Sequence, residues 1–329
     1  MTLFQAQRID IHSPLVSQWD EFVAESSTGT VYHSSAWLTA LAEGMSQNIQ
    51  IHAATASGKI QAGVVLRVSR KYGFTLGRKP WATAYNGLVV RDDADSAAIP
   101  FLLGALGKHY HHLRLVHPPG VAKPPLAKSW RQTANSTAIL NISDADKLWD
   151  SFDRHARQRI RKATSFGVTI APTDALEEFY NLYRMTYLRQ QLPMPLSCNE
   201  VTTTLRRACD AGAVRCFGAF TEQREPAAML VVGQDNKRAY FMLAGSHPSL
   251  RKTDAVSLLW WNVMLEYAKT HREIDLVGMG IGSIAHFKNS WSPQSVPFYE
   301  TTFDSSWLSQ AVLEIAQRVK DRKIGVLRR

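Results

Sequence analysis

The sequence predicts an α+β fold in two similar halves, and three observations lead to this prediction. The chain has 329 residues, which is long for one hydrophobic core and close to two domains of about 150 residues each. Both halves show the same order of expected elements: helices, neighbouring strands, then a helix and another strand. Proline dominates the end of the first half, at Pro118, Pro119, Pro124 and Pro125, and prevents regular structure there. We therefore expect domains over 1–135 and 136–329; the alternative is one large mixed domain.

The first half is expected to open with two helices, because apolar residues recur at spacings of three and four within 14–28 and 34–45. Ser34 or Ser35 can cap the second helix. The Ser57-Gly58 pair is typical of a tight hairpin turn. The further elements expected here are strands at 49–56, 60–69 and 81–90, a helix at 97–110 and a strand at 112–117.

The second half repeats this order without repeating the sequence. One long helix is expected over 144–162, because Leu148, Trp149 and Phe152 recur at helical spacing and Ser143 can cap it. Three neighbouring strands at 214–244 predict an antiparallel meander. The other expected elements are strands at 136–141, 168–171 and 274–277, and helices at 174–190, 200–210 and 255–270.

Composition excludes several classes of protein. A hydrophobic content of 45% with 20% charged residues is typical of a folded globular chain. Charged or polar residues interrupt every apolar run before it reaches the roughly 18 residues of a membrane-spanning helix. Residues 1–12 show neither the basic start nor the apolar core of a secretion signal, so we expect a cytoplasmic protein. The net charge of +10 favours polyanionic partners.

Residues 240–288 carry the clearest functional pattern. A predicted strand enters the loop 245–254, which opens the helix over 255–270. A helix start offers unpaired backbone amides and a positive dipole end, so a phosphate or carboxylate can bind there with the help of Arg251 and Lys252. The alternative is an ordinary turn, capped by Asp254 or Thr253, with two solvated cations.

A second pattern is the basic stretch 154–162, in which arginine and lysine crowd two helical turns. Such a helix can contact the phosphates of a tRNA acceptor stem or of a nucleotide diphosphate. The preferred contacts are Arg159, Arg161 and Lys162. The alternative is a solvated helix face.

The order of these motifs resembles known acyltransferases. The strand, basic loop and helix of 240–270 are similar to the acyl-CoA-binding half of GNAT-type N-acetyltransferases, and His286-Phe287-Lys288 resembles the Phe-Lys signature of Fem-type aminoacyltransferases and their FemAB-like relatives. Three further motifs resemble the same relatives: Tyr32-His33-Ser34-Ser35-Ala36-Trp37, the basic helix leading to Gly167-Val168, and the series Tyr183, Thr186 and Arg189.

The resemblance implies two tandem GNAT-like domains with mixed, mostly antiparallel sheets and flanking helices. It also implies transfer of an acyl or aminoacyl group onto an amine of a small molecule or cell-envelope precursor such as one of peptidoglycan. The loop from Arg251 to Asp254 lacks the paired glycines of typical acetyltransferases, so both acyl-CoA and aminoacyl-tRNA are candidate co-substrates. No lysine follows Trp37 where cell-wall members hold an acceptor phosphate, which leaves the acceptor open.

The chemistry needs an oxyanion-stabilising cation and groups that move protons. Lys288 is the predicted electrostatic catalyst, with a surface lysine as the alternative. Asp254 and His247 are the candidates for proton transfer, although a helix cap and a loop histidine are the alternative roles. By the resemblance, Tyr32 and Trp37 join the predicted binding residues. We expect no metal site and no tightly bound cofactor.

A second function remains open from sequence. A noncatalytic RNA-binding protein would use the same basic helix at 154–162. Candidate partners are the amine-bearing acceptor, tRNA and an anionic membrane surface, the last because the helix expected over 305–323 ends in a basic tail. No DNA partner is predicted.

Overall fold

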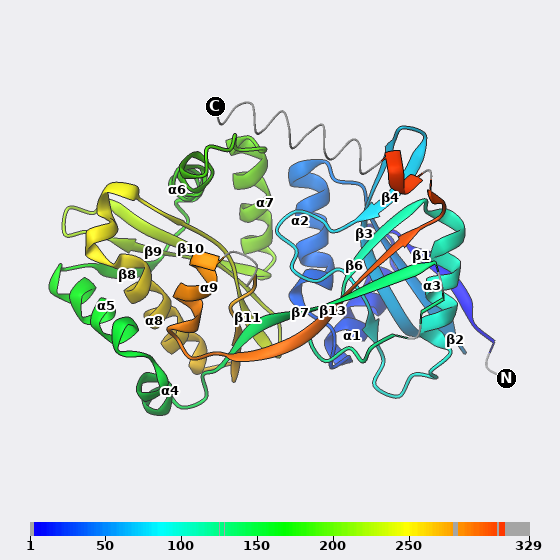
Figure 1. Cartoon of the computed structure of the whole chain (residues 1–329), viewed down its shortest axis with the longest axis horizontal. Helices are drawn as coiled ribbons and strands as arrows, with labels where there is room; N and C mark the ends of the chain where they lie inside the picture. Colours follow the sequence, from blue (N-terminus) through cyan, green and yellow to red (C-terminus); the bar gives the residue numbers. More distant parts are fainter. Residues whose placement is uncertain (1–2, 125, 128, 279–281, 308, 313–329) are drawn as a thin grey trace. The chain divides into compact units, whose positions relative to one another are not determined.

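The computed structural model describes residues 3–124, 126–127, 129–278, 282–307 and 309–312, which group into two compact units (Figure 1). Unit 1 comprises Met1–Asn135 with the described residues from Pro297 onward, and unit 2 comprises Ser136–Val296. Unit 1 is therefore built from two separate stretches of the chain. The helix expected over 305–323 lies mainly outside the described residues.

Unit 1 is built on an open sheet in which most neighbouring strands are antiparallel. Its strand order is β1 (Gln5–Ile9), β2 (Ile49–Ala56), β3 (Lys59–Lys71), β4 (Phe74–Arg78), β6 (His112–Val116) and β13 (Gln294–Asp304), with the short β5 (Val89–Val90) on β3. Only the β4–β6 pair among these is parallel. A parallel neighbour requires a crossover connection, and α3 (Ala98–His109) provides it.

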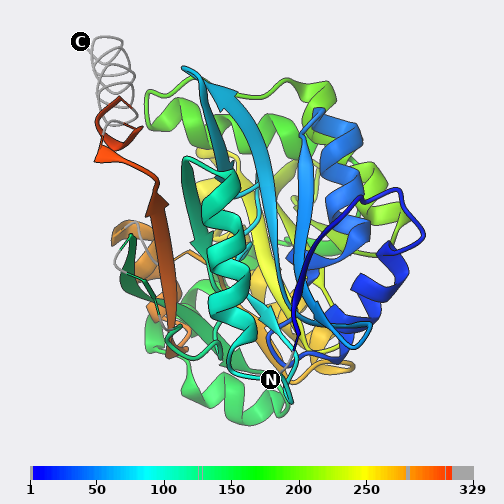
Figure 2. The same ribbon diagram turned by 90° about the vertical axis from the view of Figure 1, so that its right-hand side faces the viewer.

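The helices of unit 1 cover its sheet through apolar stripes. Leu102, Leu103 and Leu106 of α3 pack on strand residues of β2, β3 and β6, and Figure 2 shows α3 lying across the sheet. Around Gly63 of β3, a side chain would collide with the Trp19 ring, because an added Cβ would lie 2.3 Å from it. Trp19 belongs to α1 (Val16–Glu25), which is followed by the 3-10 helix η1 (Val31–His33) and α2 (Ser35–Met45).

Unit 2 repeats this plan with different residues. Its strand order is β7 (Trp130–Asn141), β12 (Glu273–Asp275), β11 (Arg238–Ser246), β10 (Pro226–Gln234), β9 (Val214–Phe220) and β8 (Thr169–Pro172), and β11–β12 is its parallel pair. The helices are α4 (Ala145–Ser151), α5 (Arg154–Ser165), α6 (Leu176–Arg189), α7 (Cys198–Asp210), α8 (Ala255–Ala268) and α9 (Gly282–Asn289), with the 3-10 helix η2 (Pro248–Thr253) before α8.

Alternation along β10 divides the interior of unit 2 into two layers. Ala228, Leu230 and Val232 belong to the cluster that includes α5 and α8. Met229 and Val231 are equally buried, and because successive strand side chains point to opposite faces they face the other layer. Helices α6 and α7 pack there, against β9, β10 and β11. Both faces of the sheet are therefore covered by helices.

The predicted fold class is confirmed: the sheets are mixed, mostly antiparallel and flanked by helices. The single helix expected over 144–162 is wrong, because the chain breaks at Phe152 and Asp153. The Asp153 carboxylate accepts the Ala156 N–H at 2.6 Å and starts a new helix, α5. The cap of α4 is Asp144 rather than Ser143, since its carboxylate accepts the Lys147 N–H at 3.1 Å.

The strand expected over 81–90 is also wrong, since only Val89–Val90 pair, with β3. Asn86 is fully buried, and its side-chain amide donates to the Val65 carbonyl at 3.0 Å and accepts the Val116 N–H at 3.0 Å. These side-chain hydrogen bonds, together with those from the Asn86 and Gly87 N–H groups to the Val116 carbonyl, hold this apolar segment without a regular ladder. Strands β1, β4 and β13 were not predicted.

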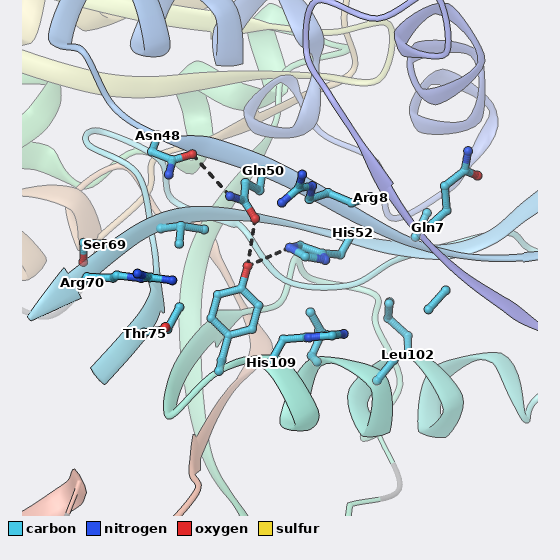
Figure 3. A pocket seen from close by; sticks show the side chains of 16 residues that line it. Gln7, Arg8, Asn48, Gln50, His52, Ser69, Arg70, Thr75, Leu102 and His109 are labelled. Atoms are coloured by element: carbon cyan, nitrogen blue, oxygen red, sulfur yellow. Dashed lines mark hydrogen bonds between the residues drawn. The ribbon is translucent and has the colours of Figure 1, made fainter. Parts of the chain in front are cut away.

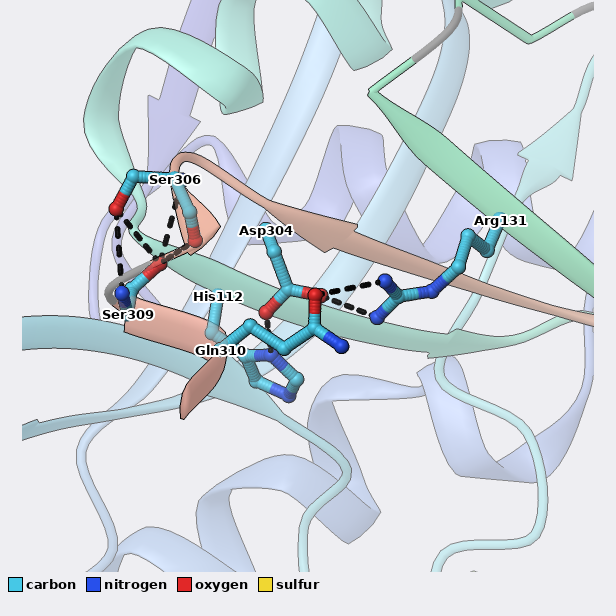
Figure 4. A network of polar contacts seen from close by, with 6 residues as sticks. All are labelled: His112, Arg131, Asp304, Ser306, Ser309 and Gln310. Atoms are coloured by element: carbon cyan, nitrogen blue, oxygen red, sulfur yellow. Dashed lines mark hydrogen bonds and ion pairs between the residues drawn. The ribbon is translucent and has the colours of Figure 1, made fainter. Parts of the chain in front are cut away.

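In each half of the sequence, one strand follows the parallel pair in the chain. This strand pairs with the last strand of the parallel pair from the other half. β7, which follows β6 in the chain, pairs with β12, and β13, which follows β12, pairs with β6. Polar contacts fix the end of β13 in unit 1 (Figure 4). The Asp304 carboxylate contacts His112 Nδ1 at 2.8 Å and the Arg131 guanidinium at 2.5 Å. The end of β13 therefore has a polar contact with β6, through His112, and with β7, through Arg131.

Candidate active site

The parallel strands β11 and β12 of unit 2 separate after their last residue pair. The β11–β12 register ends at Tyr240 and Asp275, while β11 continues to Ser246. The chain after β12 stays with β7, since the Leu276 N–H donates to the Ala138 carbonyl at 2.8 Å. A ligand that approaches residues 241–246 on this side meets backbone groups that β12 does not pair.

Lys288 of α9 lies at this separation and is not a surface lysine. Its side chain is buried, and Nζ donates to the carbonyl oxygens of Val277 and Gly278, the second at 2.8 Å. Burial lowers the pKa of Lys288 to about 8, and the charge of Asp275 opposes this shift. The amine is therefore mostly protonated at neutral pH but close to its titration range.

The carbonyls that hold Lys288 are presented by an unusual backbone. Val277 has φ of 48° and Gly278 has φ of 69°; a positive φ is rare for a β-branched residue such as valine. The fully buried Asp275 supports this bend, because its carboxylate accepts the Val277 N–H at 2.8 Å and the Thr137 hydroxyl at 2.6 Å. Asp275 thus holds the backbone bend at Val277 and Gly278, and the carbonyls of this bend hold the Lys288 amine.

The start of α8 is the second part of the site. Asp254 has φ of 53°, and its side chain makes no capping hydrogen bond to α8. Its carboxylate instead lies 2.8 Å from Lys162 Nζ of α5. The exposed Arg251 and Lys252 precede it in η2. Burial and the charge of Arg251 lower the pKa of Arg189 at the end of α6, so a third cation lies nearby.

The basic helix α5 is held on its inner side by Ala156, Ile160 and Ala163. The Arg159 guanidinium donates to Ser290 Oγ at 2.6 Å and lies 5.1 Å from the Phe287 ring centroid, so it ties α5 to the region of Lys288. The Arg161 guanidinium lies 5.8 Å from the Trp149 ring, and its side chain remains exposed.

A surface pocket of about 430 Å³ joins these elements. Its walls come from α5, the start of α8 and α9; the lining residues are Asp153, His155, Gln158, Arg159, Lys162, Asp254, His286 and Ser290. Three residues predicted from the sequence, Arg159, Lys162 and Asp254, thus line one pocket. The pocket is of the size that small ligands and cofactor fragments occupy.

Residues 150–289 match the family described as the acetyltransferase (GNAT) domain. These residues form a GNAT domain. The match includes α5, the β11–β12 separation, the start of α8 and Lys288. The predicted resemblance to the GNAT superfamily is therefore confirmed, and a GNAT fold supports acyl transfer in general.

Comparisons of structure extend the likeness to nearly the whole chain. FemX is similar with a TM-score of 0.67 at 13% identity, covering 89% of this chain and 96% of that one. A tandem GNAT protein from the clavulanic acid biosynthesis pathway gives 0.53 at 9% identity, covering 92% and 99%. L-PGS from Bacillus licheniformis gives 0.55 at 13% identity, covering 92% and 95%. These likenesses confirm the tandem GNAT-like, FemAB-like fold. No curated protein sequence matches the chain.

The remaining predicted residues have varied surroundings. His247, which lies between β11 and η2 of the GNAT domain, is half-buried, and its buried Nδ1 has no hydrogen-bond partner among the described residues. Tyr32 and Trp37 lie in unit 1 and are fully buried, so in this structure neither presents a surface to a substrate.

Sequence reasoning missed the supports of Lys288. Asp275 and Thr137 come from strands 138 residues apart in the chain, so no local spacing joins them. A signal was nonetheless present, because the carboxylate of Asp275 stands between the apolar residues Ile274 and Leu276. Ser290, two residues beyond Lys288, was not predicted either.

No group of three or more His, Cys, Asp or Glu side chains among the described residues is arranged to hold a metal ion. No helix in the described part of the chain combines the length and the apolar character needed to cross a membrane.

Proposed function

We propose that this protein is an N-acyltransferase of FemAB-like type, which moves an acyl or aminoacyl group onto an amine of a small molecule or cell-envelope precursor. The observation that carries the proposal is the burial of a lysine amine at the separation of two parallel strands in a GNAT domain. The similarity to FemX supports the FemAB-like branch.

Lys288 acts electrostatically in this proposal. The acceptor amine attacks the carbonyl carbon of the activated acyl group, and negative charge develops on the carbonyl oxygen. A fixed cation in a site with little water stabilises that charge far more than a solvated cation does. The Val277 and Gly278 carbonyls hold Nζ in place, so little reorganisation is needed during the reaction.

The reaction also moves a proton from the acceptor amine to the leaving thiolate or alkoxide. His247 supports this role through its buried Nδ1 without a partner. Asp254 fits it less well, because its carboxylate pairs with Lys162 at 2.8 Å. We assign His247 to proton transfer and Asp254 to the control of the anion site.

The donor binds, in this proposal, at the start of α8. Arg251 and Lys252 are exposed beside it, and the first turn of a helix attracts a phosphate. Acyl-CoA and aminoacyl-tRNA both carry an activated acyl group on a phosphorylated carrier, so the shared chemistry is a phosphorylated acyl carrier. The pocket between α5 and α9 is the proposed entrance.

The alternative function, RNA binding without catalysis, is not proposed. No comparison supports it, and Arg159 and Lys162 are engaged within the protein, with Ser290 and Asp254. A tRNA can still take part as the carrier of the acyl group.

Purified protein is incubated with acetyl-CoA or with a mixture of aminoacyl-tRNAs, and with a panel of small amines. Release of free thiol, or loss of the aminoacyl ester that depends on an added amine, is the expected result. The Lys288→Met protein provides the catalytic control. If neither donor is consumed while folded protein binds RNA in a salt-sensitive manner, the RNA-binding function replaces the proposed one.

A further inference from the structure

Unit 1 contains a pocket that the proposed reaction does not use. It has a volume of about 590 Å³ and lies between the strands β1 to β4 and the C-terminal end of α3 (Figure 3). This volume lies in the range of small-molecule sites. All of its lining residues belong to unit 1, so the pocket is independent of the GNAT domain in unit 2.

The charged groups of this pocket are cationic. These groups are Arg8 of β1 and Arg70 of β3, and the described lining includes no Asp or Glu. Figure 3 shows Arg8 and Arg70 extending toward the middle of the pocket from opposite sides. Neither arginine makes an ion pair with a described residue. Their field is therefore available to an incoming anion.

The polar groups between the arginines form a chain that carries no charge. His52 Nε2 lies 2.7 Å from the Tyr110 hydroxyl, which donates to Gln50 Oε1 at 3.2 Å. Burial, with the charges of Arg8 and His109, lowers the pKa of His52 to about 4, and burial raises that of Tyr110 to about 12. Both side chains are neutral at pH 7, so the chain neither neutralises the arginines nor repels an anion.

One wall of the pocket is apolar. Leu102, Ala105 and Leu106 of α3 contribute to it, and Ala53 and Val68 contribute from the sheet. A fully polar ligand such as free inorganic phosphate leaves this wall without a partner. A ligand with both a charged group and an apolar body matches both parts of the lining.

We propose that this pocket in unit 1 binds a small organic anion, whose carboxylate or phosphate group is attracted by Arg8 and Arg70 and whose apolar body lies against Leu102 and Leu106. The Gln50–Tyr110–His52 chain provides neutral hydrogen-bonding groups beside the anion. The site differs from the start of α8, because it lies at the C-terminal end of its helix and uses side chains rather than helix amides.

Phenyl phosphate and benzoate are titrated into the full-length protein at low salt, with benzyl alcohol as the uncharged probe, and binding is followed by calorimetry. Saturable binding of at least one anion and none of benzyl alcohol is expected. The double substitution Arg8→Gln and Arg70→Gln should weaken binding about tenfold or more, because charge-assisted hydrogen bonds are lost. The tighter of the two anions identifies the headgroup.

Two control variants locate the binding. Lys59→Gln removes an exposed cation of unit 1 outside the pocket, and Lys269→Gln removes an exposed cation of unit 2. Both should bind the probe as the unchanged protein does, and circular dichroism checks that every variant is folded. The proposal is overturned if neither anion binds, if the double variant binds normally, or if Lys59→Gln or Lys269→Gln weakens binding as much as the double variant does.

Discussion

The two units place a helix between parallel strands in the same way, yet the charges on the described residues just before that helix differ in sign between the units. In unit 1, α3 connects β4 to β6; in unit 2, α8 connects β11 to β12. The segment before α3 contains Asp92, Asp93 and Asp95, and the Asp95 carboxylate already accepts the Ala97 N–H at 2.9 Å. The segment before α8 contains Arg251 and Lys252.

Two units with the same strand–helix–strand arrangement can therefore differ in the charged residues that bind ligands. A helix start attracts anions only while its amides are free and the neighbouring side chains are cationic or neutral. Unit 1 fails both conditions at α3 and instead has its cations at the opposite end of the helix, around the pocket of Arg8 and Arg70. The following predictions test this division between the units, from the largest expected effect to the smallest.

Lys288→Met should lower kcat by about 10²- to 10³-fold, because a buried cation at a developing oxyanion contributes on this scale. Steady-state rates with saturating donor measure the change. Lys269→Met, at the exposed C-terminal cap of α8, is the matched control and should leave kcat unaltered. An active Lys288→Met enzyme would remove the catalytic difference between the two units.

The pH dependence of kcat/KM should show a fall above pH 8, set by Lys288. Its pKa in the folded protein is lowered to about 8, so the protonated fraction decreases as the pH rises through that value. The rate should then drop by up to about tenfold per pH unit. In Lys288→Arg the guanidinium stays charged in this range, so the residual activity should not fall. The same fall in both proteins would assign it to another group.

The substitutions Arg251→Gln and Lys252→Gln together should raise the KM for the donor about tenfold with little change in kcat, because phosphate contacts made equally in the ground and transition states affect binding alone. Initial rates at varied donor concentration separate the two constants. A loss of kcat with unchanged KM would move these cations from binding into catalysis.

Asp254→Asn should lower the KM for the donor by about two- to fivefold, since it removes a negative charge at the start of α8 and frees Lys162. The matched substitution in unit 1, Asp93→Asn before α3, should change both constants by less than about twofold. Both variants are compared at one ionic strength. Equal effects from the two substitutions would show long-range charge rather than a local site.

Much of the fold follows from local patterns, and its failures have local causes. The amphipathic stripes of α1, α2 and α6 and the hairpin at Ser57-Gly58 are short-range features, so the sequence predicts them. The division of 144–162 was missed because Asp153 caps α5 within a continuous apolar period. Strand β13 was missed because its partner β6 lies more than 180 residues earlier.

The candidate site was predictable to the extent that it depends on single residues. Arg159, Lys162 and Asp254 were each chosen from the sequence, and the structure brings them to one pocket. The pairing of Lys162 with Asp254 could not be predicted, since it joins two helices 92 positions apart. Tyr32 and Trp37 were chosen by resemblance, and only the structure reveals their burial.

The exchange of strands affects how the chain is made. β6 is complete at Val116, but its partner β13 begins at Gln294, so a ribosome must add about 180 further residues, on the order of ten to forty seconds of synthesis. During that interval one edge of β6 lacks its final partner, and an unpaired edge can pair with another chain. The N-terminal half therefore cannot complete its sheet by itself during synthesis. Its last strand pairs only after the residues of the GNAT domain have been made.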